Sequence, residues 1–262
     1  MLQQWRKPVS IALTPEGITI NSGSKPSFIA VQAEMLAGPS SWGPVLTELA
    51  NNTAKIAVRR VKFILSNHYI RYAVLPWQAG IFSQQDWQSL AENHMRILYG
   101  DVINSWKTSV AMQGYGQPLV ISAIDHLLLE GLEELASQSN WKIDVVEPAF
   151  ITISNHYHHT IKKNAWLMMI EPQRILLAEI VNDAVVRFSV VFPPIGLETN
   201  ESIKLLKREL NRQNINVEST VYLFGDHDLL PKLSIENIKS SLLSVNTKTD
   251  NTKMGSILAG LT

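Results

Sequence analysis

The stretch VKFILSNHYIRYAVLPW, residues 61–77, contains two strand signals and the turn that joins them. Residues 63–65 form the short apolar run that is typical of a strand covered on both faces. Residues 66–68 have turn chemistry, and residues 69–75 return to β-branched and aromatic side chains. Pro76 ends the second strand because it cannot donate to a ladder. We interpret this stretch as the centre of the fold.

Periodicity and turn residues predict further elements on both sides of this stretch. The elements expected before it are strands at 9–13, 17–20 and 28–32 and a crossover helix at 42–51. The elements expected after it are helices at 83–99, 125–138, 149–161 and 199–213 and strands at 106–111, 119–123, 141–146, 165–170, 175–181, 185–192 and 217–224. The three strands at 165–192 read as a meander with two tight turns, and the strand at 217–224 reads as the last one.

Composition excludes several classes of protein. The chain has 262 residues, of which 45% are hydrophobic, and this is enough for a large core. Its 23 basic and 23 acidic residues cancel, so no electrostatic footprint for nucleic acid or an anionic membrane is visible. The absence of cysteine removes disulfides, thiol nucleophiles and thiolate metal sites. No signal-peptide core and no apolar run long enough to span a membrane is found, so we expect a cytosolic protein.

The order of the elements indicates an internal duplication. Three strands, a helix and a strand precede an inserted segment, and a similar series follows it. This order is similar to that of the actin-like (ribonuclease H-like) superfamily, which implies an α/β fold of duplicated βββαβα halves with a small inserted α/β subdomain. The expected domains are a first half at 1–124 with the inserted subdomain at about 78–118, a second half at 125–232 and a flexible tail at 233–262.

Within this superfamily the chain resembles the actin-like adaptors of type IV pilus and type II secretion machines, the PilM and GspL families. The resemblance covers residues 8–232 and rests on RYAVLP at 71–76, LVISAID at 119–125, VVEP at 145–148 and VYLFG at 221–225. It implies a cytoplasmic adaptor that binds the cytoplasmic tail of an inner-membrane component and is held at that membrane by its partner. It implies no binding of nucleic acid and no membrane span.

The first phosphate turn of this fold is altered. In members that use ATP, backbone amides of a glycine turn bind phosphate, and a carboxylate orients a hydrated metal ion. Here Thr14, Pro15, Glu16 and Gly17 occupy that position. Pro15 has no amide N–H to donate. We therefore expect this turn to be degenerate.

The second phosphate turn is altered in the same way. Glu171, Pro172 and Arg174 take the place of a second acidic-glycine turn, and Glu171 would repel phosphate, an effect that Arg174 partly offsets. Only Gly225 and Asp226 keep the pattern of the adenosine-side loop. We therefore expect a protein that is not an enzyme and has no cofactor and no catalytic residue. The alternatives are an ATP-binding actin-like switch, a kinase-like enzyme, or a scaffold of this fold unrelated to pili.

A partner site is expected beside the inserted segment, in a cleft bordered by residues 69–77 and 119–123. Tyr72 and Trp77 would offer flat apolar area, and Arg71 would offer a fork of donors for a carboxylate or a backbone carbonyl. In the alternative interpretation, Arg71 pairs with an internal acid and Trp77 closes the core of the inserted segment.

The histidine cluster and the C-terminal tail carry two further predictions. His156, His158 and His159 are the only histidine cluster, but their spacing on a helix does not converge on one ion, so we expect a solvated helix end and no metal. The tail places Met254, Ile257, Leu258 and Leu261 at helical spacing after a polar segment at 246–253, which is expected to be disordered. This predicts a segment that orders on a partner or on a neighbouring copy in a homo-oligomer.

Overall fold

The computed structural model describes residues 8–22, 26–32, 39–53, 60–193, 199–213, 215, 220–225, 239–243 and 258. The chain forms two compact units. The first contains Met1–Tyr69, His126–Ile153 and Val245–Thr262, and the second contains Ile70–Asp125 and Ser154–Ser244. Among the described residues, every helix is too short or too polar to cross a bilayer.

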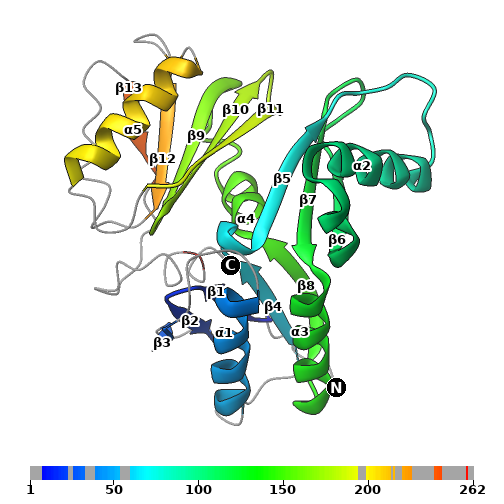
Figure 1. Cartoon of the computed structure of the whole chain (residues 1–262), viewed down its shortest axis with the longest axis vertical. Coiled ribbons are helices and arrows are strands. Elements are labelled where there is room, and N and C mark those ends of the chain that lie inside the picture. Colours follow the sequence, from blue (N-terminus) through cyan, green and yellow to red (C-terminus); the bar gives the residue numbers. More distant parts are fainter. Residues whose placement is uncertain are drawn as a thin grey trace, which may run out of the picture. The chain divides into compact units, whose positions relative to one another are not determined.

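The first unit is built on a five-stranded sheet in the order β3-β2-β1-β4-β8 (Figure 1). Its strands are β1 (Val9–Thr14), β2 (Gly17–Asn21), β3 (Ser27–Ala30), β4 (Arg60–Leu65) and β8 (Lys142–Pro148). β1, β2 and β3 form antiparallel hairpins, whereas β4 is parallel to both β1 and β8. Each parallel neighbour requires a crossover connection.

Helices α1 (Pro39–Asn52) and α3 (His126–Gln138) pack beside each other in this unit (Figure 1). In α3, Leu128, Leu132 and Leu135 recur on one buried face at the spacing of helical turns. The Leu46 side chain lies over Gly131, where an added Cβ atom would be 2.6 Å from Leu46 Cδ1. The short helix α4 (Ala149–His156) follows β8.

The second unit contains a five-stranded sheet in the order β11-β10-β9-β12-β13. Its strands are β9 (Asn164–Glu171), β10 (Arg174–Val181), β11 (Ala184–Val191), β12 (Thr220–Gly225) and β13 (Lys239–Leu242), and α5 (Thr199–Arg212) packs against β11. The predicted meander at β9 to β11 is confirmed, with a two-residue turn at Asn182 and Asp183 in which both residues have positive φ. The two five-stranded sheets therefore share one strand order. In each sheet, three antiparallel strands come first in the chain, and the fourth strand in the chain lies parallel to the first.

A three-stranded antiparallel sheet in the order β5-β7-β6 completes the second unit. It consists of β5 (Ile70–Leu75), β6 (Trp106–Met112) and β7 (Leu119–Asp125), and the 3₁₀ turn η3 (Gly100–Ser105) precedes β6. The 3₁₀ turn η2 (Asn67–Tyr69) belongs to the first unit. Helix α2 (Gln84–Tyr99) covers it through buried Trp87, Ala91 and Met95, which pack against strand residues such as Leu75 and Ile121. The α/β class predicted from the sequence is confirmed.

Several element predictions were wrong. β5 and β7, which the sequence analysis placed outside the inserted segment, pair with each other, and β7 also pairs with β6. The helix predicted at 149–161 ends at His156, and Pro148 closes β8 instead of opening that helix. β12 is not the last strand, because β13 pairs parallel to it inside the segment expected to be a tail. Of the predicted tail helix only Leu258 is described, and it is buried; residues 246–253 lie outside the described residues.

Candidate functional site

The first predicted phosphate turn is a closed β-hairpin between β1 and β2. Thr14 and Gly17 are register partners, and the Thr14 hydroxyl donates to the Gly17 carbonyl at 3.1 Å. The Glu16 carbonyl accepts from the Val31 N–H at 2.9 Å. A phosphate cradle needs backbone N–H groups that point at the ligand, and Pro15 has none. The Thr14 hydroxyl and the Glu16 carbonyl are thus bonded within their own sheet.

The glycine that remains in this turn has a packing role. A Cβ atom on Gly17 would lie 2.2 Å from the Ile29 carbonyl oxygen and 2.6 Å from the Phe28 ring. Contacts this short do not occur between real side chains and backbone, so β3 packs over Gly17 only because the residue lacks a side chain. The glycine is therefore explained without a ligand.

The second predicted turn joins β9 to β10 and contains buried charges. Glu171 and Arg174 are register partners and are each only 3% exposed. One Arg174 Nη donates to the Ile70 carbonyl at 3.2 Å, and the guanidinium lies 5.3 Å from the centroid of the Phe192 ring. Burial, followed by the nearby Arg71, lowers the pKa of Arg174 to about 10, while Glu171 opposes this shift. The Arg174 side chain is thus held inside the unit.

Arg71 meets Arg174 at a shared acceptor. An Arg71 Nη also donates to the Ile70 carbonyl at 3.2 Å, and burial lowers the pKa of Arg71. The charges of Arg71 and Glu171 act on Arg174 in opposite directions: Arg71 lowers its pKa and Glu171 raises it. Both sequence interpretations of Arg71, as a partner-binding residue and as the partner of an internal acid, stay predictions.

The other two predicted partner residues do not join Arg71. Tyr72 is 7% exposed and stacks on Phe188 of β11, with ring centroids 5.0 Å apart. Trp77 packs against Trp87 and Tyr115, each at a centroid distance of 5.2 Å. The ring of Tyr72, a residue of β5, therefore packs against β11. Trp77 lies at the edge of the core of the three-stranded sheet. Their role in partner binding stays a prediction.

The predicted adenosine-side loop begins at Gly225, the last residue of β12. A Cβ atom there would lie 2.2 Å from the Ile170 carbonyl oxygen, so the close approach of β12 to β9 explains this glycine. Asp226 lies outside the described residues.

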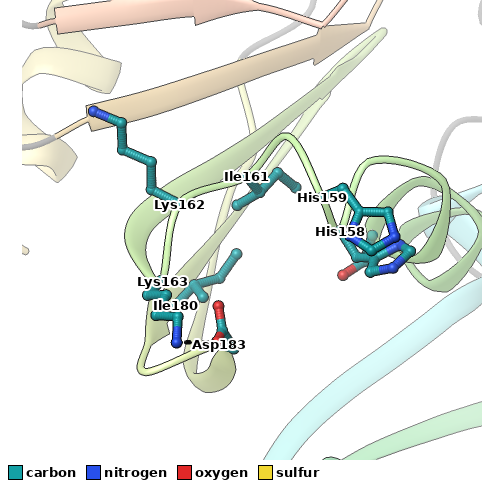
Figure 2. Close-up of a pocket in the computed structure, with 8 residues that line it drawn as sticks. His158, His159, Ile161, Lys162, Lys163, Ile180 and Asp183 are labelled. Atoms are coloured by element: carbon teal, nitrogen blue, oxygen red, sulfur yellow. Dashed lines mark ion pairs between the residues drawn. The ribbon is translucent and has the colours of Figure 1, made fainter.

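A pocket of about 800 Å³ lies at the start of β9. Figure 2 shows the rings of His158 and His159 side by side at one end and the ion pair of Lys163 and Asp183 at the other. The ring centroids are 3.6 Å apart, and the ion pair measures 3.6 Å. The Lys162 side chain extends away from both groups (Figure 2), so the cationic groups do not converge. In the described part of the chain, no three histidine, aspartate or glutamate side chains are grouped to hold a metal ion.

Sequence reasoning missed the contacts of Gln113, which follows β6. Its side chain forms hydrogen bonds with the backbone of Val185 in β11 and with the Pro118 carbonyl. A glutamine in a loop carries no sequence signal for such a contact. The sequence indicates only that a tight turn follows, because Gly114-Tyr115-Gly116 comes directly after Gln113.

No family model matches the sequence, and a search of curated proteins finds no similar sequence. Solved structures are similar in fold. A chain of a PilM–PilN type IV pilus biogenesis complex has a TM-score of 0.65 at 12% identity, covering 98% of both chains. A protein with an actin-like ATPase fold from Bacteroides thetaiotaomicron has a TM-score of 0.62 at 10% identity, covering 98% of this chain and 95% of that one.

A third similar structure is the cytoplasmic domain of EpsL, an inner-membrane component of the type II secretion system of Vibrio cholerae. It has a TM-score of 0.56 at 9% identity, covering 97% of this chain and 92% of that one. At such identities the likeness shows the fold. The chain therefore has the actin-like fold that the sequence predicted.

Proposed function

We propose that the chain is a non-enzymatic adaptor of a type IV pilus or type II secretion assembly machine. In this role it binds the cytoplasmic tail of an inner-membrane component and is held in the cytoplasm at the membrane by that partner. The observation that carries the proposal is the first turn: the Thr14 hydroxyl and the Glu16 carbonyl bond within their own sheet, and Pro15 has no N–H for a phosphate.

The similar structures support the choice of machine. One belongs to a complex of type IV pilus biogenesis, and another is the cytoplasmic domain of an inner-membrane secretion component. Both match nearly the full length of this chain. A protein of actin-like fold that does not bind phosphate can still use its surface to bind other proteins, and an adaptor needs only such a surface.

The alternative function is an ATP-binding switch of the same fold. The observation in its favour is the pair Arg71 and Arg174, whose positive charges lie beside the second turn. Against it, Glu171 lies in the same cluster, and both guanidinium groups already bond to the Ile70 carbonyl. We therefore rank the adaptor first.

A titration with synthetic peptides tests the adaptor role. The peptides are the cytoplasmic tails of the inner-membrane proteins encoded beside this gene, and binding is measured by calorimetry. We expect one tail to bind and the Arg71→Ala and Trp77→Ala variants to lose about 1–3 kcal/mol each, as anchor residues do. Lys107→Ala is the matched control, because Lys107 is an exposed cation on β6.

The thermal midpoint of each variant is measured alongside. Trp77 packs on Trp87, so a large fall in the midpoint of Trp77→Ala with unchanged affinity would assign that residue to the core. If no tail binds the wild-type chain while Mg-ATP does, the adaptor proposal is wrong and the switch replaces it.

A further inference from the structure

Two loops of the three-stranded sheet contain no charged residue. They are PWQAGIFS at 76–83, between β5 and α2, and MQGYGQP at 112–118, where β6 turns into β7. Charged residues make up 18% of the chain, so about three would be expected among fifteen residues. We call these two loops together the aromatic tip.

The two loops lie at the same end of the sheet. Leu75, Leu119 and Met112 are register partners across β5, β7 and β6, which places the loops that follow or precede them side by side (Figure 1). Trp77 of the first loop meets Tyr115 of the second edge to face at 5.2 Å. Trp77 and Tyr115 thus join the two loops at this end of the sheet.

The aromatic tip exposes large apolar side chains. Phe82 is 88% exposed, Tyr115 is 89% exposed and Met112 is 62% exposed. Of the twelve exposed large hydrophobic side chains among the described residues, these three belong to the aromatic tip. Single exposed apolar residues are ordinary, but a group of them at one place marks an interaction surface.

The backbone holds these side chains outward. The Gln117 N–H donates to the Gly114 carbonyl at 3.3 Å, and Gly116 has φ of 73°, as the third position of a type II turn requires. Tyr115 therefore stands at the corner of a defined turn. At the other loop the Ser83 hydroxyl accepts from the Asp86 N–H at 3.0 Å and caps α2 directly after Phe82. The exposure of both rings is built into the fold.

We propose that the aromatic tip inserts shallowly into the interface of a lipid bilayer. Aromatic side chains with one apolar body and a polar edge prefer the interface between headgroups and acyl chains. The absence of charge means that no ion is desolvated on entry. The loop backbone remains in the hydrated headgroup layer, where it keeps hydrogen-bond partners.

This inference goes beyond the adaptor role and does not depend on it. It predicts membrane contact that is driven by apolar area and is independent of anionic lipid. Co-sedimentation with phosphatidylcholine vesicles, with and without added phosphatidylglycerol, measures it directly. We expect the full chain to bind both kinds of vesicle and to remain bound at high salt.

The test variant is the double substitution Phe82→Ser and Tyr115→Ser, and we expect its affinity for vesicles to fall about tenfold or more. Both side chains are almost fully exposed, so the thermal midpoint is expected to stay unchanged. Ile97→Ser is the matched control: Ile97 is 83% exposed near the other end of α2, and its loss is expected to leave vesicle binding intact.

Three results would overturn the proposal. The first is a wild-type chain that sediments with neither kind of vesicle. The second is binding that needs phosphatidylglycerol and is released by salt, which indicates an electrostatic contact elsewhere. The third is a double variant that binds vesicles as well as wild type but loses a protein partner, which makes the aromatic tip a protein-binding surface.

Discussion

The side chain of Gln113 pairs with the backbone of Val185 as a neighbouring strand would. The Val185 N–H donates to Gln113 Oε1 at 2.7 Å, and Gln113 Nε2 donates to the Val185 carbonyl at 2.8 Å. Val185 lies in β11, the edge strand of its sheet, and its partner in β10 is Ile180. One carboxamide thus satisfies both backbone groups of an edge residue and ties the turn after β6 to that edge.

Gln113→Ala is expected to destabilise the protein by about 1–3 kcal/mol, because a part-buried N–H and carbonyl lose their partner. Hydrogen exchange at the Val185 amide is expected to accelerate. Gln78→Ala, at an exposed position in the loop after β5, is the control. Unchanged exchange at Val185 in Gln113→Ala would show that the contact does not protect this edge.

Glu209 of α5 predicts a dependence of stability on pH. A hydrogen bond from Arg212, with others from Ser189 and Gln213, lowers its pKa from 4.5 to about 2. Because the folded-state pKa is lowered, the contribution of Glu209 to stability is present above pH 4.5 and is lost as pH falls through about 2. In Arg212→Ala we expect the carboxyl resonance of Glu209 to titrate at a higher pH. A resonance that titrates at the same pH in both proteins would contradict this account.

A partly buried ion pair links β4 and β8. Lys62 Nζ lies 2.8 Å from Glu147 Oε2, which also accepts from the Thr152 hydroxyl at 2.6 Å. Lys62→Ala is expected to cost about 1–3 kcal/mol of unfolding free energy, because it leaves a carboxylate without its cation. The control is Arg60→Ala, which breaks the more exposed pair with Asp144 and is expected to cost less than about 1 kcal/mol. Equal costs for the two variants in urea unfolding would contradict the difference in burial.

The packing role of two glycines is testable by substitution. Gly17→Ala and Gly225→Ala each place a Cβ atom 2.2 Å from a backbone carbonyl oxygen and are expected to cost about 2–4 kcal/mol. Gly43→Ala is the control, and its expected change in stability has the opposite sign. Gly43 lies within α1 with no atom within 4 Å of its added Cβ, so alanine is expected to stabilise by about 0.5–1 kcal/mol. Wild-type stability in Gly17→Ala would remove the structural explanation of that glycine.

Local sequence patterns predicted most of the helices and strands. They did not predict which strands pair with one another. The hairpin at Thr14 to Gly17 and the turn at Asn182 and Asp183 follow from turn chemistry within a few residues. The partner of β5 is β7, more than forty residues later in the chain. Strand propensity describes a pleated, half-buried surface and says nothing about which strand lies beside it.

The candidate site was predictable where it depends on residue type and unpredictable where it depends on burial. The lack of an amide N–H at Pro15 is visible in the sequence. Arg174 follows Pro172 and Gln173 in a turn, and no local pattern predicts that it is 3% exposed and donates to Ile70, a residue 104 positions away. Such a contact depends on the tertiary arrangement alone.

The central claim is that the two phosphate turns of this actin-like fold have become structural turns. Thermal unfolding of the purified chain with and without Mg-ATP tests it most directly. We predict an unchanged midpoint and no release of phosphate. A nucleotide at a hundred times its dissociation constant would stabilise the folded state by about 2.7 kcal/mol, so a midpoint raised by several degrees with Mg-ATP would contradict the claim.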